Sequence, residues 1–563
     1  MNPSSKAFTD TLPILSYRDT ILSSVDSHQV TIITAETGAG KSTQVPQYLA
    51  EHGYDKIIIT QPRILAARNL SRRVREEWAE RNHKDSTPII GYRTAHERDD
   101  DPDNAILYCT DGLQLVRELT GSGTHSRQVL VLDEIHEWNE NMEVLIAWSK
   151  KRCSEDPHFK VVLMSATIEA ESLAQYFGDA ATISVPGRSF PVVKRQGSDL
   201  IQEIMLEIES PRPTNMLVFL PGKAEIENVA DVIKNKAKAA TIPIIPLHSQ
   251  LEPEVQQRAF ANYPSGKVIL ATNVAQTSIT IDDIDMVIDS GLERRTEVRS
   301  GVEGLFIAEV SRADCLQRAG RAGRTKEGTY VLAQYDILPC APLDKRPEYG
   351  VHEILRKHID RLVLRLANIG IDIEELDFFH DPKKSAIKRA KAKLVTLGAL
   401  TKQGKITPVG KAMERFPVES GFARMLVESE KYSPSVQTKL AAIIALQEVE
   451  GIVKNGSRYT GWRRYTTQTQ SDLLGQYDVY LALPGIDPLD YEDLGIIAKN
   501  VSKATDVRER LLRDLGIADD TLQPVEANEV APLLRCIAAG QLDQLWSIQT
   551  NGDAIHLGSS ARR

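Results

Sequence analysis

The stretch TIITAETGAGKSTQVPQYLAEHG, residues 31–53, joins an apolar run, a turn with two glycines and a segment with helical spacing. A strand, a tight turn and a helix start in this order aim backbone N–H groups at a phosphate, and the helix dipole supports them. Ala35 stands where the usual phosphate-binding signature has its first glycine, and a methyl group fits there if φ is negative. The Lys41 ammonium would reach the terminal phosphates and the Ser42 hydroxyl would bind Mg²⁺. We therefore predict a nucleotide-binding turn formed by Thr37, Gly38, Ala39, Gly40, Lys41, Ser42 and Thr43.

Apolar runs of the same kind recur up to about residue 345, and each is followed by a helical pattern. Such alternation is typical of parallel sheets covered by helices on both faces. Pro186 and Gly187 interrupt the pattern and divide the runs into two series. The sequence thus predicts an α/β fold with two lobes, residues 1–187 and 188–345, followed by a mostly helical region. In that region VHEILRKHIDRLVLRLANIG, residues 351–370, predicts one amphipathic helix that ends at a glycine.

The composition is that of a globular protein with large cores, since 42% of the 563 residues are hydrophobic and 26% are charged. The chain does not open on a basic patch followed by an apolar run, and no apolar run approaches the about 20 residues that span a bilayer. Five scattered cysteines indicate buried thiols in a reducing compartment. We expect a soluble intracellular protein, cytoplasmic or, in a eukaryote, nuclear, with no membrane partner.

The net charge of −9 gives no support to nucleic-acid binding, for which a basic balance is usual. The segment QPRILAARNLSRRVR, residues 61–75, nevertheless holds five arginines and no acidic residue. The overall charge therefore neither establishes nor excludes a polyanionic partner.

Two adjacent carboxylates end the apolar run in VLVLDEIHEWN, residues 129–139. Unpaired charges are costly to bury, so Asp133 and Glu134 are unfavourable as core residues. In phosphoryl transfer one such carboxylate holds Mg²⁺ through water, and its neighbour orients and deprotonates the attacking water. We predict that Asp133 and Glu134 complete, with Ser42, the metal site of a nucleotide hydrolase; an ordinary acidic turn at a strand end is the alternative.

Arginine and glycine recur in QRAGRAGR, residues 317–324, within the second predicted lobe. A guanidinium beside a γ-phosphate stabilises the charge that develops in phosphoryl transfer. Because Lys41 and Glu134 belong to the first lobe, the nucleotide would bind between the lobes and its hydrolysis would change how they meet. The alternative is a stretch that solvates a helix or binds phosphate without catalysis. The spacing predicts that the start of a helix carries Arg318, Arg321 and Arg324.

Nine short motifs, in order and with appropriate gaps, resemble those of the DEAH-box (DExH) group of superfamily 2 helicases. They are AETGAGKST, TQPRILAAR, TDG, DEIH, SAT, LVFLPGKAEIE, LHSQL, ATNVAQTSITID and QRAGRAGR. Each motif alone is weak, but the ordered set covers nearly the whole chain. The resemblance implies two tandem RecA-like lobes that hydrolyse ATP and bind a nucleic-acid strand.

The resemblance also implies a role for residues of each motif. The catalytic residues would be Glu134, His136, Gln317, Arg321 and Arg324, of which the last three would close on the γ-phosphate. Asp133, Asp289 and Gly291 would lie near the nucleotide. Coupling to the strand would involve His136, Ser165, Ala166 and Thr167. Backbone phosphates would be contacted by Arg63, Thr110, Asp111, Thr272 and Asn273. For Thr110, Thr272 and Asn273 ordinary strand-end capping is the alternative, and for Arg63 a surface charge.

Three residues depart from the family pattern. Ile135 replaces the usual alanine, which we expect to be harmless because this side chain packs. Trp138 stands where the family commonly has arginine, so a local contact has changed. Gln276 occupies a usual glutamate position and removes a charge near the lobe interface, which bears on coupling more than on hydrolysis.

The C-terminal third resembles the same family. LVTLGALTKQGKITPVGKAMERFPVES, residues 394–420, looks like its winged-helix segment. The predicted domains are winged-helix-like over 346–415, a ratchet-like helical bundle over 416–545, and the truncated start of an OB-like domain over 546–563, where a five-stranded barrel does not fit. SRYTGWRRYTTQ, residues 457–468, interleaves aromatics with cations, either as a single-strand stacking surface or as a bundle loop that covers apolar surface.

We therefore expect an ATP-dependent RNA helicase or translocase that uses ATP, or another NTP, with Mg²⁺. It would move 3′ to 5′ on single-stranded RNA and unwind or remodel RNA or RNP; direction and RNA preference come only from the resemblance. A protein activator that docks on the C-terminal domains is a further partner that the resemblance allows. Two alternatives stay open: a DNA helicase or translocase of the same superfamily, and a nucleotide-gated RNA-binding clamp or assembly factor with little unwinding.

Overall fold

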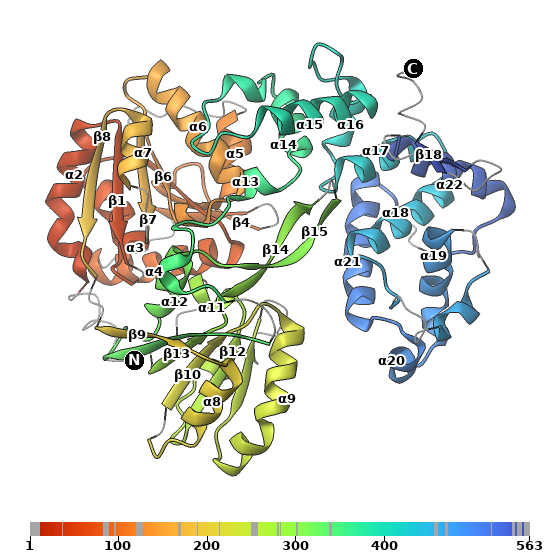
Figure 1. Ribbon diagram of the computed structural model, residues 1–563. Coiled ribbons are helices and arrows are strands. Elements are labelled where there is room, and N and C mark those ends of the chain that lie inside the picture. The colour runs from red at the N-terminus through yellow and green to blue at the C-terminus, as the bar shows by residue number, and fades with distance from the viewer. Residues whose placement is uncertain are drawn as a thin grey trace. The chain divides into compact units, whose positions relative to one another are not determined.

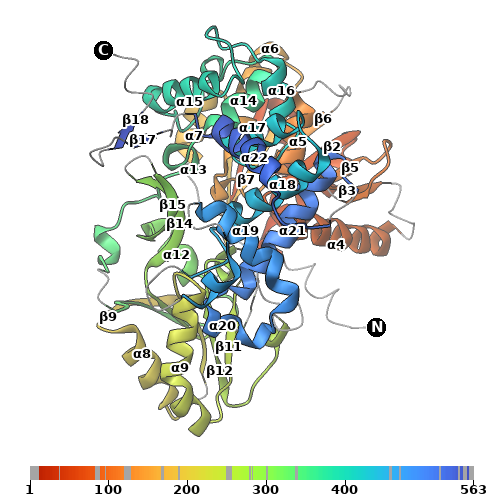
Figure 2. The same ribbon diagram turned by 90° about the vertical axis from the view of Figure 1, so that its right-hand side faces the viewer.

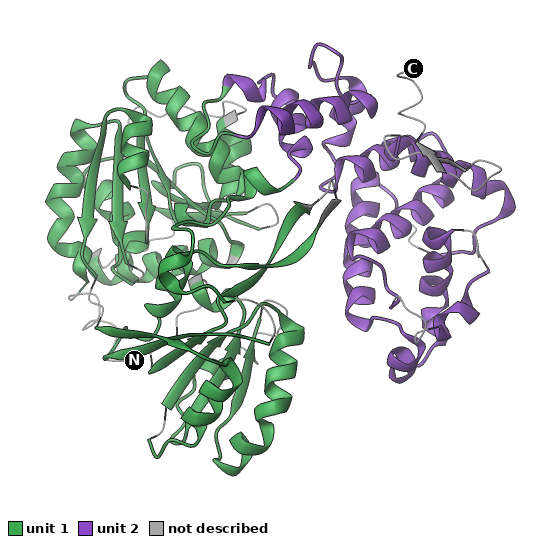
Figure 3. Ribbon diagram, viewed as in Figure 1, with its two compact units in different colours: residues 1–357, 376–381 green, residues 358–375, 382–563 purple. Residues whose placement is uncertain are grey.

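The chain forms two compact units (Figure 3). The first unit consists of Met1–Lys357 and Leu376–Asp381, and the second of His358–Glu375 and Pro382–Arg563. The first unit is thus discontinuous, because the chain leaves it and returns over Leu376–Asp381. The computed structural model describes residues 12–36, 38–82, 89–94, 97–119, 128–166, 170–187, 190–212, 214–248, 257–277, 281, 283–299, 302–336, 340–454, 460–467, 471–518, 521–542, 546–548 and 554–556.

The first lobe of the first unit contains a sheet of order β4-β3-β5-β2-β6-β7-β1-β8 (Figure 1). Neighbouring strands are parallel except for the short edge pair β3–β4. Every residue of β2 is buried, as the continuous apolar runs predict. The strands are Val30–Ala35 (β1), Lys56–Gln61 (β2), Ile90–Arg93 (β3), Arg98–Asp99 (β4), Ile106–Thr110 (β5), Gln128–Leu132 (β6), Lys160–Ser165 (β7) and Ala180–Val185 (β8). The helices and 3₁₀ turns are Pro13–Tyr17 (η1), Arg18–Ser27 (α2), Lys41–Glu51 (α3), Ile64–Asn82 (α4), Asp111–Leu119 (α5), Ile135–Glu137 (η2), Glu140–Glu155 (α6) and Ala170–Phe177 (α7).

The second lobe contains a sheet of order β11-β12-β10-β13-β16-β9, parallel throughout. Alternate residues of β10 enter two separate apolar clusters, Leu217 and Phe219 in one and Met216 and Val218 in the other. The second of these clusters contains residues of α8 and α9, which cover one face of the sheet (Figure 1, Figure 2). The sheet strands are Val192–Gly197 (β9), Thr214–Phe219 (β10), Ile244–Leu247 (β11), Gly266–Ala271 (β12), Met286–Asp289 (β13) and Gly328–Ala333 (β16). The helices and turns are Leu200–Ile208 (α8), Lys223–Ala239 (α9), Arg258–Phe260 (η3), Val274–Thr277 (α11), Arg312–Ala319 (α12), Leu343–Lys345 (η4) and Glu353–Arg356 (α13).

An antiparallel hairpin extends the second lobe, and the sequence analysis did not predict it. Its strands are Leu292–Arg299 (β14) and Val302–Glu309 (β15), paired from Leu292↔Glu309 to Arg299↔Val302. Charged residues dominate β14, so it lacks the apolar run by which the other strands were recognised.

The second unit is mostly helical, as predicted. Helix α17 packs on α22, and α18 packs on α21. Helix α15, an antiparallel bridge between Leu400 and Ile406, and helix α16 form the segment that resembles a winged helix in the sequence. Its elements are Asp360–Asn368 (α14), Ile373–Glu375 (η5), Lys384–Thr396 (α15), Pro408–Met413 (α16), Ser420–Ser429 (α17), Pro434–Glu448 (α18), Gly461–Tyr465 (η6), Asp472–Ala482 (α19), Leu483–Gly485 (η7), Pro488–Asp490 (η8), Tyr491–Leu494 (α20), Ala498–Leu515 (α21), Ala527–Gly540 (α22), Trp546–Ile548 (β17) and Ala554–His556 (β18).

The single helix predicted over residues 351–370 is wrong. The structure has two helices there, α13 and α14, separated by an extended Lys357. The apolar spacing continues across the break because Ile354 is buried in the first unit, whereas Leu362 and Leu366 are buried in the second. Throughout the described residues, no helix combines the length and the apolar character needed to cross a membrane.

Candidate active site

The predicted phosphate turn lies between β1 and α3. Gly38 and Gly40 have φ values of 91° and 92°, in the left-handed region that favours glycine. Space is also restricted at Gly40, since an added Cβ would lie 2.9 Å from Leu12 Cδ1. Helix α3 begins at Lys41 directly after the turn, so the free N–H groups of its first turn are available to an anion. Thr37 lies outside the described residues.

Lys41 is buried at this turn and contacts the carboxylate pair that follows β6. Its Nζ lies 3.3 Å from Glu134 Oε1. Burial opposes the charge of Lys41, but the charges of Glu134 and Asp133 outweigh burial and raise its pKa above the ordinary value. Burial likewise opposes the charge of Glu134, but Lys41 and His136 lower its pKa below the ordinary value. Glu134 is therefore ionised at neutral pH and can accept a proton from water.

Asp133 is fully buried and held by three donors. Gln61 Nε2 donates to Oδ2 over 2.6 Å, the backbone N–H of Glu134 donates to Oδ1 over 2.9 Å, and the Ser42 hydroxyl also hydrogen-bonds to this carboxylate. Burial and the neighbouring Glu134 raise the pKa of Asp133. The carboxylates of Asp133 and Glu134 and the Ser42 hydroxyl are the oxygen ligands that Mg²⁺ prefers, so the donor set fits this ion. Gln61 was not among the predicted site residues, and its signal in the sequence is a polar residue at the end of a buried strand.

Glu134 has φ 54° and ψ 38°, the left-handed conformation, in a residue that is not glycine. Such a conformation costs about 1–3 kcal/mol and is retained where surrounding structure fixes it. The backbone N–H of Glu137 donates to the Glu134 carbonyl over 2.9 Å and closes a turn. This turn returns the His136 ring toward Glu134, so that Nδ1 lies 3.4 Å from Glu134 Oε2 and 3.3 Å from Ser165 Oγ.

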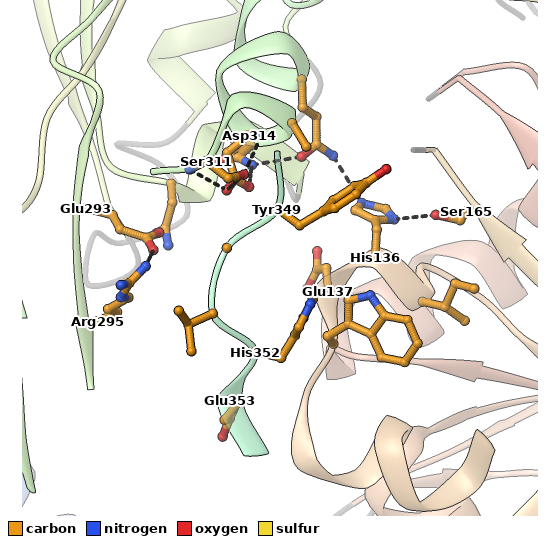
Figure 4. Close-up of a pocket in the computed structure, with 18 of the residues that line it drawn as sticks. His136, Glu137, Ser165, Glu293, Arg295, Ser311, Asp314, Tyr349, His352 and Glu353 are labelled. Atoms are coloured by element: carbon orange, nitrogen blue, oxygen red, sulfur yellow. Dashed lines mark hydrogen bonds and ion pairs between the residues drawn. The ribbon is translucent and has the colours of Figure 1, made fainter. Parts of the chain in front are cut away.

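His136 also reaches the second lobe (Figure 4). Its Nε2 lies 3.1 Å from Gln317 Nε2. Burial lowers the pKa of His136, and the opposing effect of Glu134 is smaller, so the imidazole is neutral at neutral pH. A neutral imidazole accepts at one nitrogen and donates at the other. His136 can therefore accept from the Gln317 amide while its Nδ1–H points to Ser165 and Glu134.

Gln276 organises the side of the second lobe that meets His136. Its Nε2 donates to Gln317 Oε1 over 2.8 Å and to Asp314 Oδ1 over 2.9 Å, while its Oε1 accepts from Arg318 Nε over 3.0 Å. A glutamate here would have no N–H for Asp314 and Gln317. The residues around position 276 therefore suit a glutamine, which differs from the glutamate of the family pattern.

The arginine motif spans the end of a helix, since Gln317 and Arg318 lie in the last turn of α12, so the predicted helix start is wrong. Ser311 and Asp314 form a capping box that begins α12 earlier, and the helix ends at Ala319. Beyond it, Arg321 is buried and donates to the Gln276 carbonyl oxygen. The positive charge of Arg321 also contributes to the lowered pKa of Glu134, so its field extends to the first lobe.

Arg318 and Asp289 form a buried ion pair inside the second lobe. Arg318 Nη1 lies 2.8 Å from Asp289 Oδ1, and the two side chains are 1% and 0% exposed. The remaining Asp289 contacts come from the Gly291 backbone N–H at 2.8 Å and the Tyr330 hydroxyl at 2.8 Å. Both oxygens of Asp289 are therefore bound within the second lobe, and its expected contact with the nucleotide stays a prediction.

The residues expected to contact nucleic acid lie in three different settings. Arg63 and Asn273 line a cavity of about 300 Å³ together with His136 and Gln317, and Arg63 Nη2 lies 3.4 Å from Glu137 Oε2. Thr110 and Thr272 are half-buried at strand ends. Asp111 is 2% exposed and accepts from Asn139 Nδ2 over 2.8 Å, and burial raises its pKa to about 6. Asp111 thus joins α5 to the start of α6 in this structure.

The coupling motif SAT begins at the end of β7. Ser165 is fully buried and contacts His136 through its hydroxyl, and Ala166 follows the strand in a half-buried position. Thr167 lies outside the described residues. The buried lysine, the ionised glutamate and the oxygen ligands therefore converge at the phosphate turn, an arrangement suited to hydrolysis of a phosphoanhydride.

Family models match three parts of the chain. Residues 16–176 match the DEAD/DEAH box helicase model, and residues 197–326 match the helicase conserved C-terminal domain. Residues 394–418 match the winged-helix form of the helicase associated domain (HA2). The first two matches fall on the two lobes, and the third on the segment from α15 to α16. The chain is a member of helicase superfamily 2, an ATP-dependent helicase with two helicase domains and an HA2 winged-helix domain.

Proposed function

We propose that the protein uses ATP hydrolysis to move 3′ to 5′ along single-stranded RNA, and that it thereby unwinds or remodels RNA. The observation that carries the proposal is the path of polar contacts from Glu134 through His136 to Gln317. This path joins Glu134, the proposed general base in the first lobe, to Gln317 in the arginine motif of the second lobe. A displacement of Glu134 therefore alters the contacts that hold the lobes together.

The site residues have separate parts in this reaction. Bound Mg²⁺ would neutralise charge on the phosphates and polarise the bond that breaks. Ser42 and Asp133 would hold the ion. Lys41, which pairs with Glu134 in this structure, would exchange that carboxylate for phosphate oxygens. Glu134 would then be available to orient water and accept its proton, and Arg321 would stabilise the developing negative charge.

RNA as the substrate, the direction of movement and the DEAH subtype rest on the resemblance of the nine motifs. The cavity lined by Arg63, Asn273 and His136 supports a strand site connected to the nucleotide site. Contacts to backbone phosphates give affinity without sequence choice, which suits a protein that moves along a strand. In this proposal residues 1–187 and 188–345 are the bodies that move.

The decisive experiment is Glu134→Gln with Glu155→Gln as the matched control, because Glu155 is an exposed glutamate at the end of α6. Glu134→Gln should still bind ATP and should lose hydrolysis and unwinding together, whereas Glu155→Gln should retain both. If RNA-dependent function survives Glu134→Gln, the protein is a clamp rather than a motor.

The substrate class is tested by ATPase stimulation with single-stranded RNA and DNA of equal length and sequence. Greater stimulation by RNA supports the proposal, and equal or greater stimulation by DNA assigns the protein to DNA. Duplexes with a 3′ or a 5′ overhang test the direction, since a 3′ to 5′ motor unwinds only the first.

A further inference from the structure

Trp138 occupies the position where the family resemblance leads one to expect arginine, and its ring packs on a segment from the C-terminal half of the sequence. We call this segment, Leu376–Asp381, the strap. The strap belongs to the first unit although residues of the second unit precede and follow it (Figure 3). Its Phe379 ring stacks on Trp138 with centroids 5.3 Å apart and planes inclined by 11°.

A second aromatic ring holds Phe379 from another direction. Tyr176 meets Phe379 edge-on, with centroids 5.4 Å apart. Trp138 meets the next strap residue, His380, edge-on at 4.5 Å. Stacked and edge-to-face arrangements at these separations are the favourable ones for aromatic side chains. Phe379 is therefore held between Trp138, which follows the turn that begins at Glu134, and Tyr176 of α7.

Polar contacts at both ends of the strap hold it to the first lobe. Lys150 Nζ lies 2.6 Å from Asp377 Oδ2, and the Tyr176 hydroxyl donates to the Asp377 carbonyl oxygen. His380 Nδ1 lies 2.7 Å from Glu143 Oε1, whose side chain is fully buried on α6. A buried carboxylate with an imidazole at this distance is a charge-assisted contact, which is stronger than a neutral one.

The donor atoms of Glu143, His352 and His380 lie within 4.8 Å of one another, as in a metal site. The two imidazole rings are stacked, with centroids 3.5 Å apart and planes inclined by only 20°. A metal ion lies close to the plane of each imidazole that binds it, and two nearly parallel rings stacked face to face do not share such a point. The cluster therefore serves to fix the strap rather than to bind a cation.

Trp138 is joined directly to the turn that positions the catalytic residues. Its backbone N–H donates to the Ile135 carbonyl oxygen over 3.1 Å. The same turn begins at Glu134 in its left-handed conformation and carries His136 to Gln317. A strained conformation persists only where neighbouring structure fixes it, and the Trp138 ring is the part of this turn that the strap contacts.

We propose that Trp138 and Phe379 are positioning residues of the ATPase reaction. Their stack holds the turn from Glu134 to Trp138, so the strap determines how well Glu134 and His136 are placed. Among the described residues the strap contacts Trp138, α6 and α7, so it should affect the rate of hydrolysis more than the binding of ATP. This inference rests on the role of Glu134 in the proposed function.

The test is steady-state ATPase activity of the full chain carrying Phe379→Ala, Phe379→Tyr or Trp138→Ala. Phe260→Ala is the matched control, because Phe260 is 53% exposed on the second lobe. The rate is expressed per site that binds a fluorescent ATP analogue, so that unfolded protein does not count. Phe379→Ala is expected to lower kcat about tenfold while KM for ATP stays within about twofold. Phe379→Tyr should restore most of kcat because it keeps the ring.

The double variant Trp138→Ala with Phe379→Ala separates positioning from general stabilisation. If the two rings act through their stack, the double variant should be no slower than either single variant, because residues in contact are not additive. A wild-type kcat per binding site in Phe379→Ala, a rise in KM with unchanged kcat, or losses that multiply in the double variant would each overturn the inference. Absence of ATPase activity in the wild-type chain would instead overturn the proposed function.

Discussion

Replacing Gln317 by leucine tests whether the contact between the lobes carries catalysis. Leucine has nearly the volume of glutamine but no amide, so the 3.1 Å contact with His136 Nε2 is lost without a large cavity. Gln276 Nε2, which also donates to Gln317, keeps its bond to Asp314. Two groups therefore lose a partner: one N–H of the Gln276 amide, and the His136 acceptor, which lies in a buried part of the site.

The expected rise in the activation free energy follows from the loss of the contact between His136 and Gln317. A lost hydrogen bond contributes about 0.5–1.5 kcal/mol net, and an unsatisfied buried acceptor costs about 1–3 kcal/mol. We expect Gln317→Leu to raise the activation free energy by about 1–3 kcal/mol, which lowers the RNA-stimulated kcat by about 5- to 150-fold. Gln202→Leu, an exposed glutamine on α8, is the matched control and should leave kcat unchanged.

The assay is ATP hydrolysis at saturating single-stranded RNA, in wild-type and His136→Phe backgrounds. Since phenylalanine has no ring nitrogen, Gln317→Leu should add less than about 0.5 kcal/mol in that background. Two results would refute the reasoning: a Gln317→Leu rate within about twofold of wild type, or equal losses in both backgrounds. Either result would mean that the contact between His136 and Gln317 does not transmit anything needed for hydrolysis.

Three further predictions concern charge, burial and backbone conformation. Burial lowers the pKa of His136 below 6.5, so its neutral form persists as the pH falls. We therefore expect kcat to stay constant down to pH 6.5 and to decline only below it. A profile of kcat against pH with its midpoint above 6.5 would contradict this prediction. Arg318→Met leaves the buried Asp289 carboxylate without its cation and should destabilise the protein by about 3–5 kcal/mol in denaturant unfolding, a loss that Asp289→Asn should partly reverse in the double variant. Gly40→Ala, at φ 92° and with its Cβ 2.9 Å from Leu12 Cδ1, should weaken binding of a fluorescent ATP analogue by about tenfold. Gly485→Ala, with nothing within 4 Å of the added Cβ, should fold and bind like the wild type and is the control.

Local patterns predicted most of the first unit because each signal lies within a few consecutive residues. The apolar runs around Ile32, Ile58 and Val131 mark buried parallel strands, and the structure confirms them. The phosphate turn could be predicted for the same reason, since Gly38 and Gly40 need a backbone conformation that few other residues adopt.

The errors arose where the pattern depends on what packs against it. Strand β14 has the sequence LERRTEVR, whose charged side chains hide its pairing with β15. The apolar spacing over residues 351–370 is helical on both sides of Lys357, but the two sides belong to different units. A sequence pattern records which side chains are buried and does not record in which core.

The candidate site was predictable only in part for a related reason. Lys41 and Glu134 stand in recognisable motifs, and the structure places their charged atoms 3.3 Å apart. The contacts of Gln276 and Trp138 depend on residues far away in the sequence, Gln317 and Phe379, so the two substitutions could be noticed but not interpreted. Their partners became visible only in the fold.

The discontinuous first unit has a consequence for any attempt to isolate the two lobes. A fragment that stops at Lys357, where the chain first leaves the first unit, would lack Phe379, Asp377 and His380. In such a fragment Trp138 would lose the ring that stacks on it, and Lys150 would lose the carboxylate of Asp377. The buried Glu143 carboxylate would lose its contact with the His380 imidazole. Slow hydrolysis by such a fragment would result from the loss of residues that belong to the first unit itself. A minimal enzyme must therefore extend at least through Asp381.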